Sequence, residues 1–547
     1  MTRRHAVRLV AAVAGGAVLV TVASAGVGRA TSQTPRVGGK VVVGLHFEPT
    51  NLNPYLETSA PSSRAEVVDR VLDGAYSLSG RGDLVPNLIV GDPKVATRPF
   101  SLTYTIKKDA RWSDGRSITA RDFWFTWRTL RKLNRTLPED ERFTEGELIA
   151  KAKILDRRKV RFVLRKPWGG WRDFFFYILP WHALAGEDFK TVWRDRIDNP
   201  KSGRAISSGP FIFASWRRGS TLTLKRNPNY WGRKAYLDRL DFRAAATTGF
   251  SEKQALLSRK VDLITGATKA DVDELRHRPR IRINSGSTNN WEHLDFQLGA
   301  KGNPALKKPF VRRAIALAID RKALTSFQAK ELAAVKTLES ALFARTHPAY
   351  QPHWRRWNHR PKDAIRLLHS NGCRRAPDGI FSCAGKRLSF RVLSTAGFPS
   401  REVEFAALMQ QLRRVGIELR KDFAIFTVVL GTTGLLAQGD WDLALFAWIT
   451  GPDPVGWENV YGCNGTFNHQ AYCNRQVTRL LRSASAALRT RRRWALANRA
   501  DALIARDLAT VPLFHQSGLI AYDSRIRNIR CCVGIAWNAE NWWLARR

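Results

Sequence analysis

The sequence predicts an α/β protein with two or three lobes, and three observations carry this prediction. The chain has 547 residues, which is more than one hydrophobic core usually holds. Hydrophobic residues make up 44% of the chain and aromatic residues 10%, enough to fill large cores. Apolar strands alternate with helical patterns, as in LSFRVLST followed by REVEFAALMQQLRRVG, and this order is typical of βαβ units.

The N-terminal residues are typical of an export signal. A basic stretch, MTRRHAVR, precedes the apolar run Leu9–Val22, which is too short to span a bilayer comfortably. Small residues follow at Ala23–Ala25, where signal peptidase would cleave. We therefore expect a signal peptide at residues 1–25 and a linker at 26–37. No cysteine follows the apolar run to carry a lipid anchor, so the mature protein would be soluble and periplasmic or extracellular.

The chain is strongly basic. It holds 90 Lys and Arg residues against 47 Asp and Glu residues, and the formal charge of +43 favours polyanions such as wall polymers or acidic lipid headgroups. The basic residues are scattered, with short runs such as Thr490–Trp494, and no signature of specific nucleic-acid binding is present. A solvated arginine-rich surface is the simpler interpretation. A secreted protein that binds envelope polyanions stays open as an alternative, and salt-sensitive attraction would then keep it associated with the cell surface.

Six cysteines lie in the C-terminal third of the chain. Cys373 and Cys383 enclose a Pro-Asp-Gly turn, as a disulfide-closed hairpin would, and Cys463 and Cys473 enclose a loop of the same length. Zinc is the alternative, although neither pair has the spacing of roughly two to four residues found in zinc knuckles. We expect two disulfides, each contributing about 3 kcal/mol to stability. The adjacent pair Cys531–Cys532 stays ambiguous, because a bridge there would strain the peptide between them.

The stretch ARWSDGRSITARDFWFTW is interpreted as a structural corner and not as a reaction centre. Alternating apolar residues at Leu102–Ile106 predict a half-buried strand before it. Asp114 can accept hydrogen bonds from nearby backbone amides, and Gly115 is free to take a positive φ. Thr119 stands where a helix N-cap belongs, and Asp122 follows three residues later, close to a capping box. Since each polar residue has a local structural role, we expect no catalysis here.

Three other segments predict particular elements. In PFVRRAIALAIDR, Pro309 can begin a helix whose apolar residues recur on one face. The run Leu443–Ile449 is almost wholly apolar and is bounded by turn residues, which predicts a central strand buried on both faces. In NWEHLDF, Glu292, His293 and Asp295 alternate with apolar residues, so this segment is predicted to be a strand and not a catalytic cluster.

A strand followed by RWSDGRSITARDFWFTW resembles the hallmark of the family 5 extracellular solute-binding proteins, the receptors of ABC importers for peptides, nickel and other solutes. Further blocks are similar to those of the family and occur in the family's order: GLHFEPTNLNP, SSGPFIFASWRRGSTLTLKRNPNYWG, ALLSRKVDLI, KPFVRRAIALAIDRKAL, GDWDLALFAWITGPDP and DLATVPLFHQSGLIAY. The likeness extends from residue 38 to the C-terminus. Such an ordered series is much more specific than any one block.

The resemblance implies a two-lobed periplasmic-binding-protein fold of type II with an extra inserted subdomain. Lobe I would be assembled from residues 38–80, 190–288 and 516–547, the inserted subdomain from 81–189, and lobe II from 289–515. The chain would then cross between the lobes near Asn290 and again near Gln516. A ligand would lie in the cleft, and closure around it would create the surface that the importer recognises.

The function that this likeness implies is an extracytoplasmic receptor, a monomer without a cofactor. It would capture a peptide or a similar small solute in the inter-lobe cleft and deliver it to the permease of an ABC importer. The chain contains no nucleophile elbow, zinc-protease motif, Walker loop or dinucleotide-binding glycine pattern, so it is not expected to be an enzyme. A secreted hydrolase is kept as a second alternative.

Four places in the chain correspond to the positions that line the family's cleft. They are Ser62, Ser63 and Arg64 after the first Asn-Pro turn, Asn290 and Trp291 at the first crossover, Trp448, Thr450, Gly451 and Asp453 after the buried strand, and Phe514 and His515 at the second crossover. Aromatic side chains there would supply broad apolar contact, and polar groups would fix the orientation of the ligand. Each residue also has a structural interpretation, since tryptophans are often core residues and lone histidines are often structural.

One departure from the family's pattern bears on the ligand. Peptide-binding members commonly carry an aspartate a few residues after the tryptophan of the buried strand, where it pairs with the ammonium group of the ligand. In this chain that place falls at Gly451, and Asp453 follows two residues later. A buried ammonium group without a carboxylate partner costs several kcal/mol. Peptide binding is therefore the family's default but is not supported at this position.

Overall fold

The computed structural model describes residues 34–56, 61–80, 83–138, 142–244, 251–265, 267, 269–329, 335–430, 433–451, 453–531 and 537–546. The predicted signal peptide at 1–25 and Cys532 lie outside these residues. Of the predicted linker, residues 34–37 are described, and they are exposed and without regular structure. Among the described helices, none has both the length and the apolar character that a membrane crossing requires.

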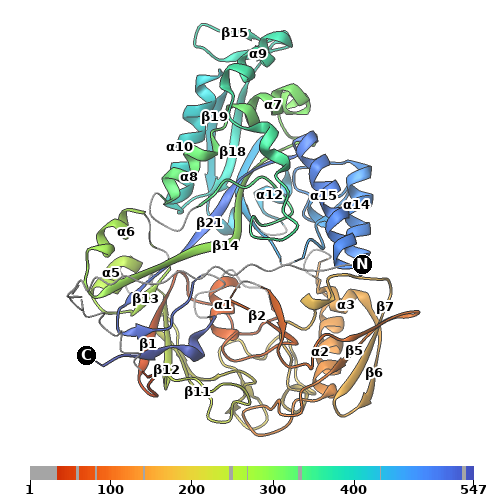
Figure 1. Ribbon diagram of the computed structural model, residues 1–547, viewed down its shortest axis with the longest axis vertical. Helices are drawn as coiled ribbons and strands as arrows, with labels where there is room; N and C mark the ends of the chain where they lie inside the picture. The colour runs from red at the N-terminus through yellow and green to blue at the C-terminus, as the bar shows by residue number, and fades with distance from the viewer. Residues whose placement is uncertain are drawn as a thin grey trace, which may run out of the picture. The chain divides into compact units, whose positions relative to one another are not determined.

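A ten-stranded mixed sheet forms the centre of the fold (Figure 1). In spatial order its strands are β10 (Phe211–Arg217), β11 (Thr221–Arg226), β12 (Arg239–Ala244), β1 (Lys40–Leu45), β13 (Leu263–Ile264), β21 (Thr510–Asp523), β14 (Ile281–Phe296), β20 (Leu443–Ile449), β18 (Ser389–Thr395) and β19 (Glu418–Ala424). β1 is parallel to β12 and β13, and β18 is parallel to β19 and β20. The predicted α/β class is confirmed, as is the βαβ unit formed by β18, α10 (Pro399–Arg414) and β19.

Two long strands, β14 and β21, connect the two halves of this sheet. They pair antiparallel, first from Ile281 opposite Asp523 to Ser287 opposite Ser517, and then again from Trp291 opposite His515. Between these stretches β14 advances by four residues while β21 advances by two, so the ladder is interrupted at residues 288–290. Such a bulge bends and twists a strand locally. The interruption therefore marks the place where the connection between the two halves is least regular.

Helices and smaller sheets accompany each half. With the first half lie α1 (Pro61–Val68), α2 (Ala120–Leu133), α3 (Thr144–Leu148), α4 (Trp181–Leu184), α5 (Glu252–Leu257), α6 (Lys269–Arg276), and the strands β2 (Tyr76–Leu78), β3 (Leu84–Pro86), β8 (Asp198–Asn199), β9 (Arg204–Ala205), β22 (Ile526–Arg527) and β23 (Trp543–Leu544). A separate four-stranded sheet there has the order β4 (Lys94–Thr97), β5 (Phe100–Thr105), β7 (Lys159–Leu164), β6 (Ile149–Asp156).

The second half is richer in helices. It contains α7 (Pro309–Ala318), α8 (Arg321–Ala329), α9 (Pro361–Ser370), α11 (Phe426–Val429), α12 (Leu435–Gln438), α13 (Glu458–Tyr461), α14 (Arg475–Ala486), α15 (Thr490–Asp507), and the hairpin strands β15 (Arg374–Arg375), β16 (Phe381–Cys383) and β17 (Lys386–Arg387). Short 3-10 turns occur in the chain at Trp171–Asp173, Pro304–Lys307, His353–Trp357 and Ala539–Asn541. Helix α7 begins at Pro309, as predicted.

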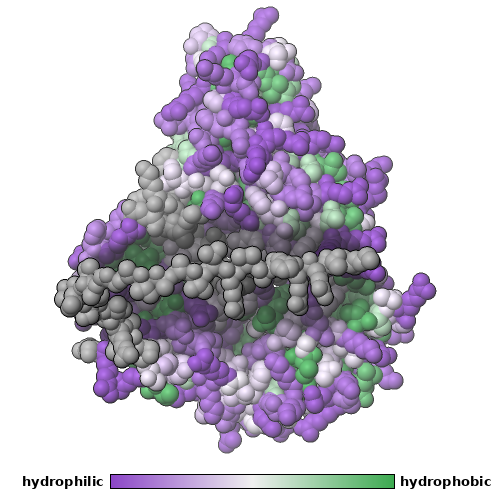
Figure 2. Space-filling view, in the orientation of Figure 1, coloured by the Kyte–Doolittle hydropathy of each residue, from purple (hydrophilic) through white to green (hydrophobic). Residues whose placement is uncertain are grey.

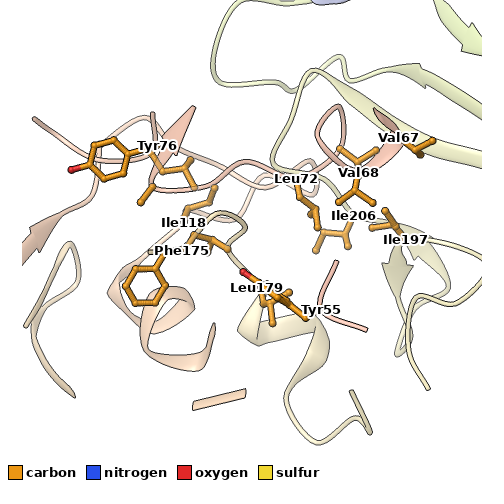
Figure 3. Packing of buried hydrophobic residues seen from close by; sticks show 14 of the residues in the cluster. Tyr55, Val67, Val68, Leu72, Tyr76, Ile118, Phe175, Leu179, Ile197 and Ile206 are labelled. Carbon is orange, nitrogen blue, oxygen red and sulfur yellow. The ribbon is translucent and has the colours of Figure 1, made fainter. Parts of the chain in front are cut away.

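Two large hydrophobic cores are separate from each other. The first draws its buried residues from positions 41–263 and 520–542, and the second from positions 291–514. Figure 3 shows part of the first core, where Phe175 and Leu179 of the predicted inserted subdomain lie with Tyr55, Val68 and Leu72. The predicted inserted subdomain therefore has no core of its own among the described residues, because its apolar side chains pack into the first core.

The corner at ARWSDGRSITARDFWFTW has the predicted local structure. Thr119 caps α2, the Asp122 carboxylate accepts from the Thr119 backbone N–H at 2.7 Å, and both halves of the capping box are present. Asp114 accepts from the Arg116 backbone N–H at 3.1 Å, and Gly115 has a φ of 87°. The local roles of these polar residues are confirmed.

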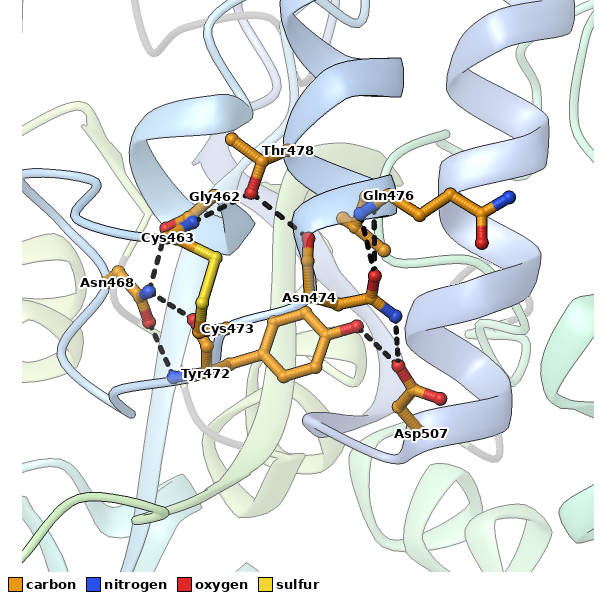
Figure 4. The surroundings of a disulfide bond; sticks show 10 residues. Gly462, Cys463, Asn468, Tyr472, Cys473, Asn474, Gln476, Thr478 and Asp507 are labelled. Atoms are coloured by element: carbon orange, nitrogen blue, oxygen red, sulfur yellow. Dashed lines mark hydrogen bonds between the residues drawn. A yellow bond between two sulfur atoms is a disulfide. The ribbon is translucent and has the colours of Figure 1, made fainter.

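Both predicted disulfides are present. Cys373–Cys383 closes the β15–β16 hairpin, and Cys463–Cys473 closes a loop that side chains also hold together (Figure 4). In that loop Asn468 donates through Nδ2 to the Gly462 carbonyl at 2.8 Å and to the Tyr472 carbonyl at 2.6 Å. The zinc alternative is wrong for these four cysteines, because their sulfurs are bonded to each other. Cys531 is also disulfide-bonded.

The prediction for the strand at Leu443–Ile449 holds for its first part alone. β20 is central, between β14 and β18, and Leu443–Phe446 are buried against cores on both faces. Ile449 is 71% exposed, so the prediction of burial on both faces is wrong at this end. β18 pairs with the first two residues of β20, Leu443 and Ala444. The last residues of β20 therefore extend past their pairing with β18.

Candidate functional site

The carboxyl ends of two sets of parallel strands point toward each other. β1 is parallel to β13, β13 is antiparallel to β21, and β21 is antiparallel to β14, so β1 runs in the same direction as β14. β20 is antiparallel to β14, and β18 and β19 run with β20. The ends of β1 and β12 in one half therefore face the ends of β18, β19 and β20 in the other. In open α/β sheets, ligands bind outside the carboxyl ends of the strands.

Side chains from the two ends approach each other directly. His46, just after β1, and Phe398, just after β18, have ring centroids 6.2 Å apart. Large apolar side chains are also exposed in these end segments: Phe47 is 48% exposed, Ile425 62% and Ile449 71%. Figure 2 shows the surface hollowed between the upper and lower parts of the view. An apolar hollow with a few polar groups is the usual character of a small-molecule site.

Six of the predicted site residues meet at the interrupted stretch of β14. Asn290 lies opposite Ile449, Trp291 opposite both Trp448 and His515, and Glu292 opposite Phe514. The Thr450 backbone N–H donates to the Asn289 carbonyl at 2.8 Å. Residues that the sequence separates by more than two hundred positions are thus brought together by strand pairing.

Burial divides these residues into two groups. The side chains of Trp291 and Phe514 are fully buried in the second core, and Thr450 is 4% exposed. In this conformation they line no space that a ligand could enter. Asn290 and Trp448 are half-buried. They are at the surface of the candidate site.

Among the described residues, the indole N–H of Trp448 lacks a hydrogen-bond partner, as does that of Trp291. The Trp448 ring is stacked on that of His293 at 6.3 Å, with an interplanar angle of 2°, and lies near Phe446 and Phe467. Its indole Nε1 is buried and makes no hydrogen bond to any described atom. An unmade hydrogen bond at a buried donor is costly. The donor is therefore unpaired within the described part of the chain but not exposed in this conformation.

His515 has a structural role at the interrupted stretch of β14. Its Nδ1 lies 3.3 Å from the Asn290 carbonyl oxygen, and its Nε2 accepts from the Arg345 backbone N–H at 3.4 Å. These partners require a neutral ring with the proton on Nδ1. Burial lowers the pKa of the imidazole from 6.5 to about 4. The side chain thus ties β21 to β14 at the interruption.

Acid is expected to weaken the fold through His515. The folded-state pKa of about 4 lies below the ordinary value of 6.5, so protonation favours the unfolded chain. The stabilisation is complete above pH 6.5 and is lost as the pH falls to about 4, a change of about 3 kcal/mol. Urea unfolding across this range should show a smaller pH dependence for His515→Gln than for the native chain. His277→Gln is the control because His277 is exposed, and identical pH dependences for all three proteins would contradict the prediction.

The carboxylate of Asp453 is already paired with an arginine. Its carboxylate accepts from Arg493 twice, through Nε and Nη2, both at 3.0 Å. The Arg493 side chain is 1% exposed and that of Asp453 17%. Gly451, two residues before it, is exposed, and a Cβ placed there would meet only the Asp453 carbonyl oxygen, at 3.6 Å. The site therefore has room for a side chain at position 451 but no free carboxylate nearby in Thr450–Gly456.

Ser63 and Arg64 lie on α1, in the first half. Ser63 is 4% exposed. Arg64 donates through Nη1 to the Asn53 carbonyl at 3.0 Å and also to the Leu56 carbonyl, so it braces the turn that precedes α1. Burial lowers its pKa. No described contact joins either residue to the group at β14. The side chain of Ser62 lies outside the described residues.

A buried polar network beside the interrupted stretch of β14 was missed by the sequence interpretation. Glu292 is 1% exposed and pairs with Arg401 at 3.3 Å. Gln516 donates to the same carboxylate, and Arg401 donates to Thr395. The partners Glu292 and Arg401 are 109 residues apart, so no local pattern could reveal them. The exposed Phe47 and Ile449 were also missed, although their places at strand ends were a usable signal.

Comparisons with known proteins bear on this arrangement. A family model described as bacterial extracellular solute-binding proteins, family 5 Middle, matches residues 83–468. The oligopeptide-binding protein OppA of Mycobacterium tuberculosis is 24% identical over 506 residues, covering 90% of this chain and 82% of that protein.

Solved structures agree on the fold. The periplasmic EDTA-binding protein EppA has a TM-score of 0.82 at 22% identity, over 94% of this chain and 98% of its own. AppA from Bacillus subtilis, solved in complex with a nonapeptide, has a TM-score of 0.74 at 19% identity, over 94% and 100% of the two chains. The predicted two-lobed fold is confirmed by these likenesses, and below we call the half around β1 lobe I and the half around β20 lobe II.

Proposed function

Because the chain belongs to the bacterial extracellular solute-binding proteins of family 5, we propose that it captures a small solute between the facing strand ends of its two lobes. The relatives of this chain are substrate-binding proteins of ABC transporters for peptides or metal complexes, and the chain is a solute receptor of that type. The family binds its substrates and does not convert them. We infer that this chain releases its solute chemically unchanged, acts as a monomer and is exported.

The observation that carries the proposal is the interrupted pairing of β14 and β21. Two separate cores are connected there by strands whose ladder breaks at residues 288–290. Hinges are typically a few residues that absorb a change in backbone angles between rigid bodies. A small rotation at this break would open or close the space between His46 and Phe398.

We assign the predicted residues to two roles. Trp448, Gly451 and Asn290 would contact the solute, together with the exposed Ile449 and Phe47. Their apolar surface would give most of the contact, and the unpaired Nε1 of Trp448, which is buried in this conformation, would supply a directional hydrogen bond once the Trp448 ring turns toward the solute.

The buried residues would position this surface. Trp291 and Phe514 pack behind it, and Thr450 and His515 hold the strand ends through hydrogen bonds. Ser63 and Arg64 would support the opposite rim through α1. Asp453 belongs to this supporting group because Arg493 occupies both of its oxygens.

We further propose that the solute does not depend on a free ammonium group. The glycine at position 451 offers no carboxylate, and Asp453 is neutralised by Arg493. A peptide-like solute with a blocked amino end, or an anionic chelator such as the EDTA that EppA binds, satisfies this condition. A free peptide would leave its ammonium group without a partner, at a cost of several kcal/mol on burial.

The proposal is tested by thermal unfolding with matched solutes. A solute that binds the folded state raises the melting temperature according to RT ln(1 + [L]/Kd). We expect N-acetylated peptides or metal–EDTA complexes to raise it more than the same peptides with free amino ends, and the solute to be recovered unchanged. Preferential stabilisation by the free peptides would contradict the assignment of the solute, and consumption of any solute would contradict the receptor function.

Gly451→Asp is expected to create a preference for free peptides. The added carboxylate enters open space and could pair with an ammonium group, which is worth roughly ten- to a hundredfold in affinity as a charge-assisted hydrogen bond. Titration calorimetry with one peptide in free and acetylated form would measure the change. Gly451→Asn, of the same size but neutral, is the control. Equal affinities for the two peptides in Gly451→Asp would place this position away from the amino end of the ligand.

The charge of the chain supports one further aspect of this proposal. The full chain carries +43, and without residues 1–25, which contain Arg3, Arg4 and Arg8, it carries about +40; this charge would hold an exported receptor at an anionic envelope by an attraction that salt screens. We propose this association as a secondary property alongside solute capture. Release of the protein from cells by about 1 M salt, where screening is nearly complete, would support it, and full retention would contradict it.

A further inference from the structure

Helices α14 and α15 carry an unusual concentration of exposed arginine. The two helices pack side by side on lobe II (Figure 1). Their inward faces are apolar or small, including Val477, Leu481, Ala497 and Ile504. The exposed arginines of this helical pair and of the turn between its helices are Arg475, Arg479, Arg482, Arg489, Arg491, Arg492, Arg499 and Arg506. We call this set the arginine face.

The spacing of these residues places them in rows. Arg475, Arg479 and Arg482 are separated by four and three residues, so they lie on one side of α14. On α15, Arg492 and Arg499 are separated by seven residues, as are Arg499 and Arg506. At 1.5 Å per residue the two helices are about 18 Å and 27 Å long. The result is two adjacent rows of cations on rigid supports.

Few carboxylates neutralise the arginine face. From Arg475 to Asp507 the chain contains just two acidic residues. Asp501 is fully buried, and Asp507 pairs with Arg506 at 2.9 Å. Among the described residues, no ion pair involves the other seven arginines of the face. Glu458, which lines a cavity together with Arg482, is one further acidic neighbour at the edge of the face.

The surroundings of the face extend the same charge. A cavity of about 490 Å³ beside the end of α14 is lined by Arg482 together with Lys166 and Trp168 of the predicted inserted subdomain. Glu458 also lines it, and the Glu458 carboxylate accepts from Ser485 at 2.7 Å while burial raises its pKa. The positive region thus reaches beyond lobe II at this edge.

We propose that the arginine face adsorbs to the phosphate headgroups of an anionic lipid bilayer. Planar guanidinium groups pair with phosphate oxygens through two parallel hydrogen bonds. The rows are carried on helices about 18 Å and 27 Å long, which suits an extended array of headgroups. The inference rests on the proposed function in one respect: a receptor that delivers its solute to an ABC transporter works beside the bilayer that holds the transporter.

The composition of the face indicates adsorption without insertion. Apart from arginine, the exposed residues of α14 and α15 are Gln476, Ser483, Ala486 and Ala495. Helices that enter the acyl region present large apolar side chains such as Trp, Phe or Leu on the membrane side. The contact would therefore be electrostatic, reversible and sensitive to salt.

Flotation of the exported chain with lipid vesicles tests this inference. We expect binding to vesicles containing phosphatidylglycerol, none to vesicles of phosphatidylcholine alone, and release at about 0.5 M salt. A variant with Arg475, Arg479, Arg492 and Arg499 replaced by glutamine should partition at least about a hundredfold less, since each basic residue near an anionic membrane contributes about 1 kcal/mol.

A matched variant distinguishes the effect of the arginine face on vesicle binding from the effect of total net charge. Lys362, Arg374, Lys386 and Arg420 are also exposed, form no ion pair among the described residues, and lie on α9, β15, β17 and β19. Their replacement by glutamine removes the same charge and should leave most of the vesicle binding. Equal losses in the two variants would overturn the assignment and leave only an effect of total charge.

Two further outcomes would also overturn the proposal. One is binding to soluble polyphosphate, lost in the arginine-face variant, with no binding to either kind of vesicle; the face would then recognise a free polyanion. The other is undiminished vesicle binding by the arginine-face variant. For this outcome to count, the variant must melt at the same temperature as the native chain. Solute-induced thermal stabilisation is measured on the same samples, so failure of membrane adsorption is distinguishable from failure of the receptor function.

Discussion

Arg493→Met is expected to lower the free energy of unfolding by about 3 to 5 kcal/mol, the usual cost of removing one member of a buried ion pair. Arg493 is 1% exposed and donates twice to Asp453. It also donates through Nη1 to the Ala487 carbonyl at 2.7 Å. Methionine retains most of the apolar stem but leaves the carboxylate and the carbonyl without their partner.

The same substitution should affect the contact between lobe II and the predicted inserted subdomain. The Gly169 backbone N–H donates to the Ser485 carbonyl at 2.6 Å, and a Cβ at Gly169 would come within 2.8 Å of Arg493 Nη1. This approach depends on the fixed position of the guanidinium group. We therefore expect weaker solute binding as well as lower stability.

Urea unfolding measures the loss, and Arg492→Met is the matched control. Arg492 is the adjacent residue, is exposed, and forms no ion pair with a described carboxylate. Substitutions at such surface positions usually change stability by less than about 0.5 kcal/mol. Similar unfolding midpoints for the two variants would show that the pair with Asp453 contributes little.

Asp501→Asn is expected to raise the free energy of unfolding by about 4 kcal/mol near pH 8. Asp501 is fully buried on α15, and desolvation raises its pKa from 3.8 to about 7. Its Oδ1 accepts from the Ala341 backbone N–H at 3.0 Å, whereas Oδ2 has no hydrogen-bond partner among the described atoms. Asparagine retains the acceptor and removes the charge.

The sign of the pH dependence follows from the raised pKa. A carboxyl group whose pKa is about 7 in the folded state and 3.8 when unfolded favours folding below pH 3.8, and this contribution is lost as the pH rises to about 7. The native chain should therefore lose stability over this range relative to Asp501→Asn. Unfolding curves at several pH values measure the difference between the two proteins.

Asp507→Asn is a control of opposite sign on the same helix. Asp507 accepts from Tyr472 at 2.8 Å, from Asn474 at 2.7 Å and from Arg506 at 2.9 Å, and these partners lower its pKa despite partial burial. Its replacement should destabilise the protein near neutral pH. A loss of stability in both variants would mean that Asp501 is stabilised as a carboxylate by its surroundings.

Local patterns predicted many of the elements correctly. Thr119 and Asp122 lie three residues apart, and a capping box requires no other part of the chain. Pro309 begins α7 for a similar reason. Each cysteine pair encloses a short loop, so chain length alone favours closure. In these cases the interacting groups are neighbours in sequence, and their geometry follows from one or two turns of backbone.

The candidate site was only partly predictable because its residues serve two roles that sequence does not separate. Trp291 and Trp448 both stand near a lobe crossover, yet one is fully buried and the other half-buried. Trp291 packs against Trp457 in the second core, which also contains Tyr461, and both of these residues are far from Trp291 in the sequence. Likewise, nothing near Asp453 indicated that Arg493, 40 residues later, would neutralise it.

The sequence by itself determined the α/β class, the local turns and caps, the two hairpin-like disulfides and the excess of positive charge, because these depend on composition and on residues close together in the chain. The tertiary structure alone decided which strand ends face each other, that Glu292 pairs with Arg401, that Asp453 is unavailable, and that eight arginines of α14, α15 and the turn between them are exposed. These properties depend on the direction of strands and the packing of helices that are distant in sequence. No local pattern encodes them, because the contacts form only when the whole chain folds.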